Sequence, residues 1–143
     1  NFSIDLNHYI GKFLIMASRK GKLHVLEWLV ELLICLPTIK ASINDVSIAF
    51  ANACANGHLV IAKKLWQLKM DKKLDFRLFK GSATTKNLGH AFYLAGLNGY
   101  LEVIQWLSKL DNRFPLLIKN HKKHLMEVFV DSDIRNWLDK ISQ

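Results

Sequence analysis

Apolar residues recur along the chain at intervals of three and four positions, the spacing typical of helices with one buried face. Three stretches with this spacing align without gaps, and in each a glycine separates two apolar runs, at Gly21, Gly57 and Gly99. The stretches are 13–32 (FLIMASRKGKLHVLEWLVEL), 49–68 (AFANACANGHLVIAKKLWQL) and 91–110 (AFYLAGLNGYLEVIQWLSKL). Each stretch therefore predicts a helix, a tight glycine turn and a second helix.

The columns shared by the three stretches have a physical explanation. The glycine allows a positive φ at the end of the first helix. Four residues before the glycine, each stretch has an alanine that lets two helices approach closely. These alanines are Ala17, Ala53 and Ala95. Apolar residues two, four, five, eight and eleven positions after the glycine form one stripe of the second helix. A single hairpin cannot bury this stripe, so we expect an all-α fold of stacked hairpins.

The repeats are expected at about 9–36, 45–70 and 87–112, inside a single domain that covers 1–143. A fourth, diverged hairpin at 115–142 is expected to cap the C-terminal end, with Val130 in the place of the turn glycine. Because the first residue, Asn1, is not an initiator methionine, we expect the chain to be a fragment or a processed form of a longer protein.

The ends of this repeat array carry recognisable helix signals. Pro115 is expected to open a helix that runs to about 130, and Asp131 or Ser132 to cap a last helix over about 133–141. The segment 4–10 is expected to supply a partial N-terminal cap.

Two connectors separate the first three repeats. Pro37 is expected to end a helix, and 42–45 offers N-caps for the next one. The second connector, about 70–87, is long for a compact domain. We expect it to contain a short helix at 74–80 or to form a functional protrusion.

The segments ANGHLVIAKKL and LNGYLEVIQWL resemble the turn and second helix of an ankyrin repeat, and the resemblance covers most of residues 9–110. It implies an ankyrin-like solenoid of about four helical hairpins. The threonine and proline that usually open the first helix are replaced, by Lys12, Ile48 and His90 and by Phe13, Ala49 and Ala91. The glycine-alanine-aspartate that usually follows the second helix is absent, which leaves the β-hairpin fingers of an ordinary ankyrin stack unsupported. Such degenerate repeats resemble those of large bacterial effector proteins and large DNA viruses.

The resemblance implies a protein-binding scaffold that acts through its concave face and connectors, as the targeting part of a larger effector. The sequence has no phosphate-binding glycine loop, no GxSxG and no HExxH, so we predict neither an enzyme nor a cofactor. The resemblance places partner-facing positions at Arg19, Lys20, Ser47, Ala55, Asn56, Gly89, Tyr93, Leu97 and Asn98. For Asn56 and Asn98, a purely structural role at a helix end is the alternative.

Basic residues dominate the charge, with a net charge of +8. Between 63 and 86 there are eight basic residues against two acidic ones. This excess favours an acidic partner, and the alternative is a solvated surface. In the connector, Lys72, Lys73, Arg77 and Lys80 alternate with Phe76 and Phe79, which suggests an alternative function in nucleic-acid or anionic-membrane binding.

Cys35 and Cys54 lie in apolar helical patterns, so we expect reduced core thiols and an intracellular location, in the cytoplasm or in the host cytoplasm for a secreted effector. The most apolar segment, 23–36, is too short to span a membrane. Trp28 and Trp106 share one column and Trp66 lies one position past its core leucine, which favours packing between hairpins over ligand stacking.

Two weaker patterns have competing interpretations. His121, His124 and Glu127 have a spacing that could present metal ligands on one helix face, but a solvated basic face is the better interpretation and no metal site is predicted. Asp131 and Asp133 could form a carboxylate pair, although capping of the last helix explains them better.

Overall fold

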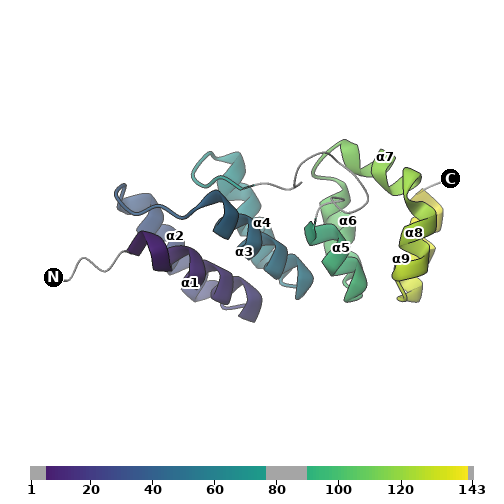
Figure 1. Cartoon of the computed structure of the whole chain (residues 1–143), viewed down its shortest axis with the longest axis horizontal. Coiled ribbons are helices and arrows are strands. Elements are labelled where there is room, and N and C mark those ends of the chain that lie inside the picture. Colours follow the sequence, from purple (N-terminus) through teal and green to yellow (C-terminus); the bar gives the residue numbers. More distant parts are fainter. Residues whose placement is uncertain (1–5, 77–89, 142–143) are drawn as a thin grey trace. The chain divides into compact units, whose positions relative to one another are not determined.

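The computed structural model describes residues 6–76 and 90–141. Every regular element among them is a helix, so the prediction of an all-α fold is confirmed (Figure 1). The chain divides into two compact units, Asn1–Arg77 and Leu78–Gln143, and each is described by itself.

The first unit contains two helical hairpins. Helices α1 (Leu6–Lys20) and α2 (Leu23–Cys35) form one, and α3 (Ile43–Ala55) and α4 (Leu59–Met70) form the other. Helix α1 lies along α3, with α2 and α4 behind them (Figure 1). The described residues of the expected N-terminal cap, 6–10, are the first turns of α1 and not a separate element.

The glycine turns have the predicted backbone conformation. The φ angles of Gly21, Gly57 and Gly99 are 71°, 74° and 82°. In each turn the residue after the glycine donates its N–H to the carbonyl of the alanine four residues before the glycine, and the three distances are 2.9, 2.8 and 3.0 Å. This bond across the last helical turn is the one that a Schellman motif makes. The alanine is buried in all three turns, as the close approach of helices requires.

Close packing joins α1 to α3. A Cβ atom on Gly11 of α1 would overlap the Asp45 side chain of α3, so glycine is needed for this approach. Lys12 Nζ lies 3.3 Å from Asp45 Oδ1 and forms an ion pair with it. The expected cap of α3 is Ser42, whose Oγ accepts the N–H of Asp45 at 3.0 Å.

An aromatic cluster forms the core beneath α3 and α4. The ring of Phe76 stacks on Phe50 with centroids 4.8 Å apart, and Trp66 meets Phe76 edge-on at 6.1 Å. Phe76 belongs to the segment after α4 and is fully buried. Residues 74–76 of the expected helix at 74–80 are not helical, and the rest of that helix lies outside the described residues.

The second unit contains one helical pair followed by three helices. The pair is α5 (His90–Leu97) with α6 (Leu101–Ser108), and the others are α7 (Arg113–Asn120), α8 (Lys122–Val128) and α9 (Ser132–Ile141). Phe92 of α5 packs between Phe114 and Phe129, with centroids 5.5 and 6.2 Å away. A Cβ atom on Gly96 would overlap the Phe129 ring, so glycine permits this contact between α5 and the end of α8.

The prediction of one continuous helix from Pro115 to about 130 is wrong. The helix begins earlier, at Arg113, and is divided at His121 into α7 and α8, which run in different directions (Figure 1). The half-buried His121 lies between the buried Leu117 and Leu125, at the point where the helix is divided. The last helix is capped as predicted, because Asp131 Oδ1 accepts the N–H of Ile134 at 3.0 Å.

Candidate interaction surfaces

The turns of the first two hairpins are joined directly. Nε2 of His58 lies 3.1 Å from the carbonyl oxygen of Arg19, and because a carbonyl only accepts, this nitrogen carries the proton. The same imidazole lies over Gly21, where an added Cβ would be 2.6 Å from the ring. The second turn is therefore fixed against the first by a side chain that only a glycine turn can accommodate.

In the second unit, the fourth hairpin brings a side chain near the turn of the third. Asp131 occupies the position in the fourth hairpin that His58 occupies in the second, one residue after the turn position. A Cβ on Gly99 would lie 3.5 Å from Asp131 Oδ2, in ordinary van der Waals contact. In each unit, the residue after the turn of the later hairpin thus faces the turn glycine of the earlier one.

The predicted partner-binding residues of the first turn are accessible. Arg19 and Lys20 end α1 with exposed side chains, and Lys22, which was not predicted, is exposed just after the turn. Asn56, at the end of α3, is exposed on the second turn, which His58 holds beside the first. The structure therefore gathers three cations at one turn edge of the first unit.

Ser47 and Asn56 both make local hydrogen bonds within α3 or at its end. Ser47 Oγ donates to the carbonyl of Ile43 at 2.7 Å, and Asn56 Nδ2 donates to the carbonyl of Asn52 at 2.8 Å. Asn56 is the C-cap of α3, which agrees with the helix-end interpretation of this residue. Ala55 is buried and cannot contact a partner.

The predicted residues of the second unit differ in accessibility. The Tyr93 ring stacks on His124 at 6.5 Å and packs against Phe129 at 6.0 Å, so it joins α5 to α8. Leu97 and Asn98 are exposed at the end of α5. Gly89 lies outside the described residues.

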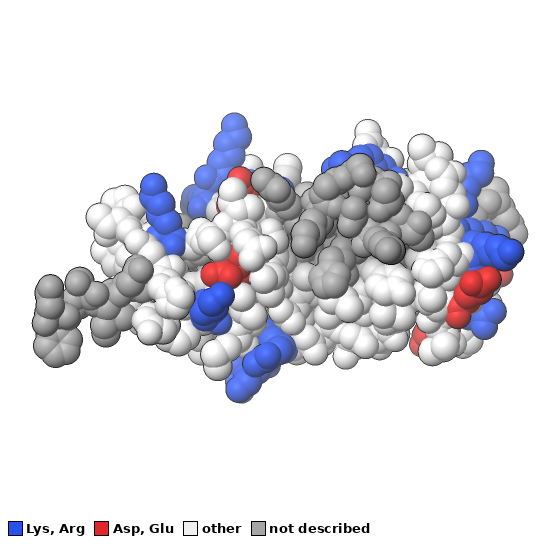
Figure 2. All heavy atoms as spheres, in the orientation of Figure 1, with Lys and Arg blue, Asp and Glu red and all other residues white. Residues whose placement is uncertain are grey.

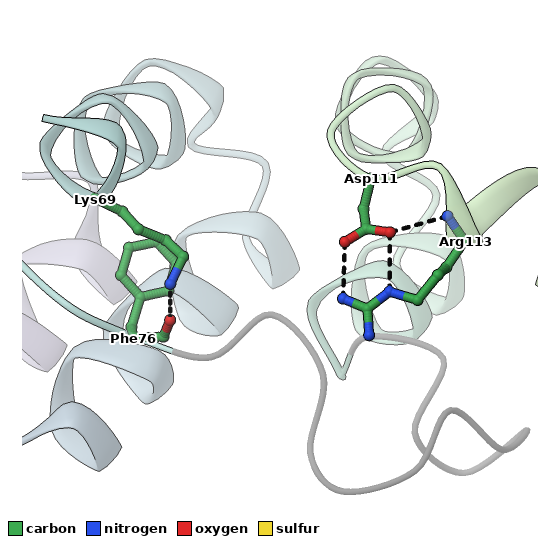
Figure 3. Close-up of polar contacts among 4 residues, drawn as sticks. All are labelled: Lys69, Phe76, Asp111 and Arg113. Carbon is green, nitrogen blue, oxygen red and sulfur yellow. Dashed lines mark hydrogen bonds and ion pairs between the residues drawn. The ribbon is translucent and has the colours of Figure 1, made fainter. Parts of the chain in front are cut away.

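Lys69, in the last turn of α4, is bound to the loop that follows it (Figure 3). Lys69 Nζ donates to the carbonyl of Phe76. It also pairs with Asp75 Oδ1 at 3.3 Å, so Lys69 binds the far end of the loop back to α4. Its ammonium group also lies 5.0 Å from the centre of the Phe76 ring. Lys72 and Lys73 are exposed.

The expectation that Phe76 serves as a stacking platform for a ligand is wrong, because its ring is buried in the core. Arg77, Phe79 and Lys80 lie outside the described residues. An open depression of about 620 Å³ remains beside the loop, and its lining includes Lys72 and Lys73.

Both units are basic, with net charges of +5 for residues 1–77 and +3 for residues 78–143, and among the described residues the excess is larger in the first unit. Among residues 6–76, ten are Lys or Arg and five are Asp or Glu, whereas among residues 90–141 the counts are seven and six. On the face shown in Figure 2, the cationic side chains of the first unit project singly, with uncharged surface between them. On this face the basic residues do not form one continuous stripe.

The tryptophans and cysteines differ in burial, although all were predicted to pack inside the fold. Trp66 is half-buried and packs on Phe50 of its own hairpin and on Phe76, and among the described residues no ring contact joins it to a neighbouring hairpin. Trp28 is 60% exposed, so the prediction that it packs between hairpins is wrong. Cys54 is a buried free thiol, whereas Cys35 is exposed, which corrects its assignment to the core. Burial raises the pKa of the Cys54 thiol well above its usual range.

Asp111 and Arg113 form a local ion pair at the start of α7. Arg113 donates to Asp111 through its backbone N–H and through Nε, both at 2.9 Å, and its NH2 lies 2.7 Å from the other carboxylate oxygen (Figure 3). These hydrogen bonds lower the pKa of Asp111.

In the described part of the chain, no three His, Cys, Asp or Glu side chains come close enough together to hold a metal ion. None of the described helices combines the length and hydropathy needed to cross a membrane.

An apolar surface on α1 was not among the predicted sites. Leu6, Tyr9, Phe13 and Met16 are all exposed on this helix. Their spacing of three and four residues marks a second apolar stripe beside the buried one, and this spacing was the signal that could have identified it.

The chain was compared with family models, with curated proteins and with solved structures, and none of them matches it.

Proposed function

We propose that this chain is an ankyrin-like scaffold of stacked helical hairpins that binds an acidic segment of a partner protein. The contact of His58 with Gly21 and Arg19 supports the proposal most directly, since it is a turn-to-turn contact of the kind that stacking in register requires. The position of Asp131 near Gly99 adds support from the second unit. In this proposal the four hairpins form one solenoid and work by binding, without catalysis or a cofactor.

The proposed binding surface is the turn edge of the first unit, with Arg19, Lys20 and Lys22 as its charged residues. All three are exposed, and the described part of this unit has an excess of basic residues. Each exposed charge pair would contribute about 0.2–1 kcal/mol and would also speed the encounter with an acidic partner. Asn56 on the adjacent turn would extend the surface by hydrogen bonding. An intracellular site of action, as part of a larger effector, belongs to the same proposal.

A defined peptide series tests this function. We would measure the binding of acidic, neutral and basic fluorescent peptides of equal length by anisotropy. The proposal expects preference for acidic peptides, weakened about tenfold or more in the variant Arg19→Glu, Lys20→Glu, Lys22→Glu.

The matched control places the same charge change on the second unit, as Lys119→Glu, Lys123→Glu, Lys140→Glu. These three side chains are also exposed. Equal weakening in both triple variants would show that net charge alone matters and would reject the turn edge as the binding site.

The depression beside Lys72 and Lys73 favours a second candidate function, the binding of nucleic acid or an anionic membrane. Such binding would rest on phosphate contacts and weaken steeply with salt. Single-stranded and duplex oligonucleotides and phosphatidylserine vesicles at low salt provide the test. Absence of binding in all three, or no loss in a Lys72→Glu, Lys73→Glu variant, would reject this candidate.

A further inference from the structure

Lysines gather on the exposed side of α4 and in the turn after it. Four of them have exposed side chains, namely Lys63 and Lys64 in α4 and Lys72 and Lys73 in the turn. Among the described residues, none of these four ammonium groups makes an ion pair or a hydrogen bond. The nearby Asp75 already pairs with Lys69. The excess positive charge of this segment is therefore directed to solvent.

The same surface carries two exposed apolar side chains. Val60 and Met70 are 64% and 60% exposed, and on α4 they lie on the same side as Lys63 and Lys64. Met70 also lines the depression of about 620 Å³ beside the loop, together with the two lysines of the turn. This residue thus joins the side of α4 to the turn. We use the name α4 surface for Val60, Lys63, Lys64, Met70, Lys72 and Lys73.

The lysines on α4 are specific to the second hairpin. Positions six, seven and ten residues after the turn glycine are occupied in α4 by Lys63, Lys64 and Gln67. The same positions are Glu27, Trp28 and Glu31 in α2, and Gln105, Trp106 and Lys109 in the third hairpin. Formation of a helical hairpin therefore does not require lysines here, and their charge is available for binding.

We infer that the α4 surface binds the surface of an anionic membrane. Its lysines would pair with the acidic headgroups, and Val60 and Met70 would enter the boundary between headgroups and acyl chains. Along α4 these two apolar residues are about 15 Å apart, with Lys63 and Lys64 between them. The inference rests on the second candidate function proposed above and selects one of its two partners.

The side chains of the α4 surface fit a membrane better than nucleic acid. Proteins that bind single strands use aromatic rings on which the bases stack. The rings of this segment face inwards, since Trp66 is half-buried against Phe50 and Phe76 is fully buried. The exposed apolar residues, Val60 and Met70, are aliphatic and cannot stack on a base. A duplex bound through its phosphates would not use them either.

Sedimentation of the chain with phosphatidylcholine vesicles that contain increasing shares of phosphatidylserine tests the inference. Binding should rise with the phosphatidylserine content. It should fall as added salt shortens the Debye length from about 10 Å at 0.1 M to about 3 Å at 1 M. Replacement of Lys63, Lys64, Lys72 and Lys73 by glutamine should weaken binding about fivefold for each lysine removed. Absence of binding to phosphatidylserine vesicles at low salt would overturn the inference.

The matched control removes the same charge from the second unit, by glutamine at four exposed positions: Lys119, Lys123, Arg135 and Lys140. This variant should lose much less vesicle binding than the variant of the α4 surface. Equal loss in both would show that net charge alone attracts the chain and would overturn the assignment to the α4 surface. Circular dichroism verifies that both variants keep their helices.

The apolar residues distinguish a membrane from nucleic acid. Val60→Ser with Met70→Ser should weaken vesicle binding about tenfold, because about half of each side chain would enter the membrane. The control, Leu116→Ser with Val130→Ser, alters residues of the second unit that are 61% and 81% exposed, and it should bind as the unchanged chain does. Unchanged vesicle binding after the Val60 and Met70 substitutions would overturn the inference. Binding of oligonucleotides without binding of vesicles would leave the second candidate function standing and also overturn the inference.

Acetylation of the lysines, followed by mass spectrometry, locates the contact without any substitution. Anionic vesicles should protect the four lysines of the α4 surface and leave Lys119 and Lys123 as reactive as in the free chain. Protection of Lys20 and Lys22 instead would place the membrane at the turn edge and overturn the inference. The acidic-peptide assay is a separate measurement, in which the glutamine variant of the α4 surface should bind as the unchanged chain does. Failure of the scaffold proposal and failure of this inference are therefore distinguishable.

Discussion

The contact between the first two turns predicts a specific energetic coupling between Gly21 and His58. At φ 71°, alanine in place of Gly21 would adopt a left-handed conformation that costs about 1–2 kcal/mol. Its Cβ would also lie 2.6 Å from the imidazole, so the ring must turn away and release the carbonyl of Arg19. Loss of this hydrogen bond costs about 0.5–1.5 kcal/mol. Gly21→Ala should therefore lower the free energy of unfolding by about 2–3 kcal/mol.

A double-mutant cycle measured by urea unfolding, followed by tryptophan fluorescence and circular dichroism, separates these two contributions. In a His58→Ala background the ring is absent, so Gly21→Ala should cost only the backbone strain, and the coupling should be about 1 kcal/mol. Gly99→Ala is the control. Its φ is also positive, but its Cβ would meet Asp131 at 3.5 Å, so it should cost about 1–2 kcal/mol and show no coupling to His58.

The reasoning fails if Gly21→Ala costs the same with and without His58. That result would mean that the imidazole does not hold the second turn against the first, and the turn-to-turn contact on which the stacking proposal depends would lose its support.

Three further predictions concern the loop after α4, the turn before α7 and the two thiols. Lys72 has a φ of 59° just after α4, so Lys72→Gly should raise the free energy of unfolding by about 1 kcal/mol in urea unfolding, whereas Lys72→Ala, which keeps the strain and removes the charge, should not. Because the hydrogen bonds from Arg113 lower the pKa of Asp111 in the folded chain, they stabilise the fold above the unfolded pKa of this carboxyl, and the stabilisation disappears as the pH falls through the lower, folded value. Asp111→Asn should therefore cost about 0.5–1 kcal/mol at pH 7 and less as the pH falls through the folded pKa of Asp111, and a cost that does not change with pH would contradict the assignment. With a thiol reagent at pH 8, Cys35 should react at once and Cys54 only on unfolding, since Cys54 is buried and its pKa is raised, and mass spectrometry of the labelled peptides distinguishes the two.

The helical hairpins of the first three repeats follow from local sequence. A glycine at the turn, a small residue four positions earlier and an apolar stripe after it are each detectable without knowledge of distant contacts. Gly21, Gly57 and Gly99 have the predicted positive φ, and Ser42 and Asp131 cap their helices. These features depend on residues close in sequence, and for that reason the pattern predicts them well.

The errors arose where neighbouring elements decide the outcome. An apolar residue on a helix is buried only if another element covers it, so the sequence alone placed Trp28 and Cys35 in the core, whereas the structure leaves both exposed. The loop after α4 folds back and buries Phe76 against Phe50, which removed it from the predicted nucleic-acid surface. Both outcomes depend on tertiary packing that helical periodicity does not contain.

The sequence by itself determined that this chain forms helical hairpins with glycine turns, because backbone conformation and helical periodicity are set over a few residues. Only the tertiary structure decided which sides of those hairpins are covered. It placed the His58 ring on Gly21, buried Asp45 between α1 and α3, and left the corresponding side of α1, with Tyr9 and Phe13, in solvent. The physical reason is that burial is a property of pairs of surfaces, and residues far apart in the sequence supply the second surface.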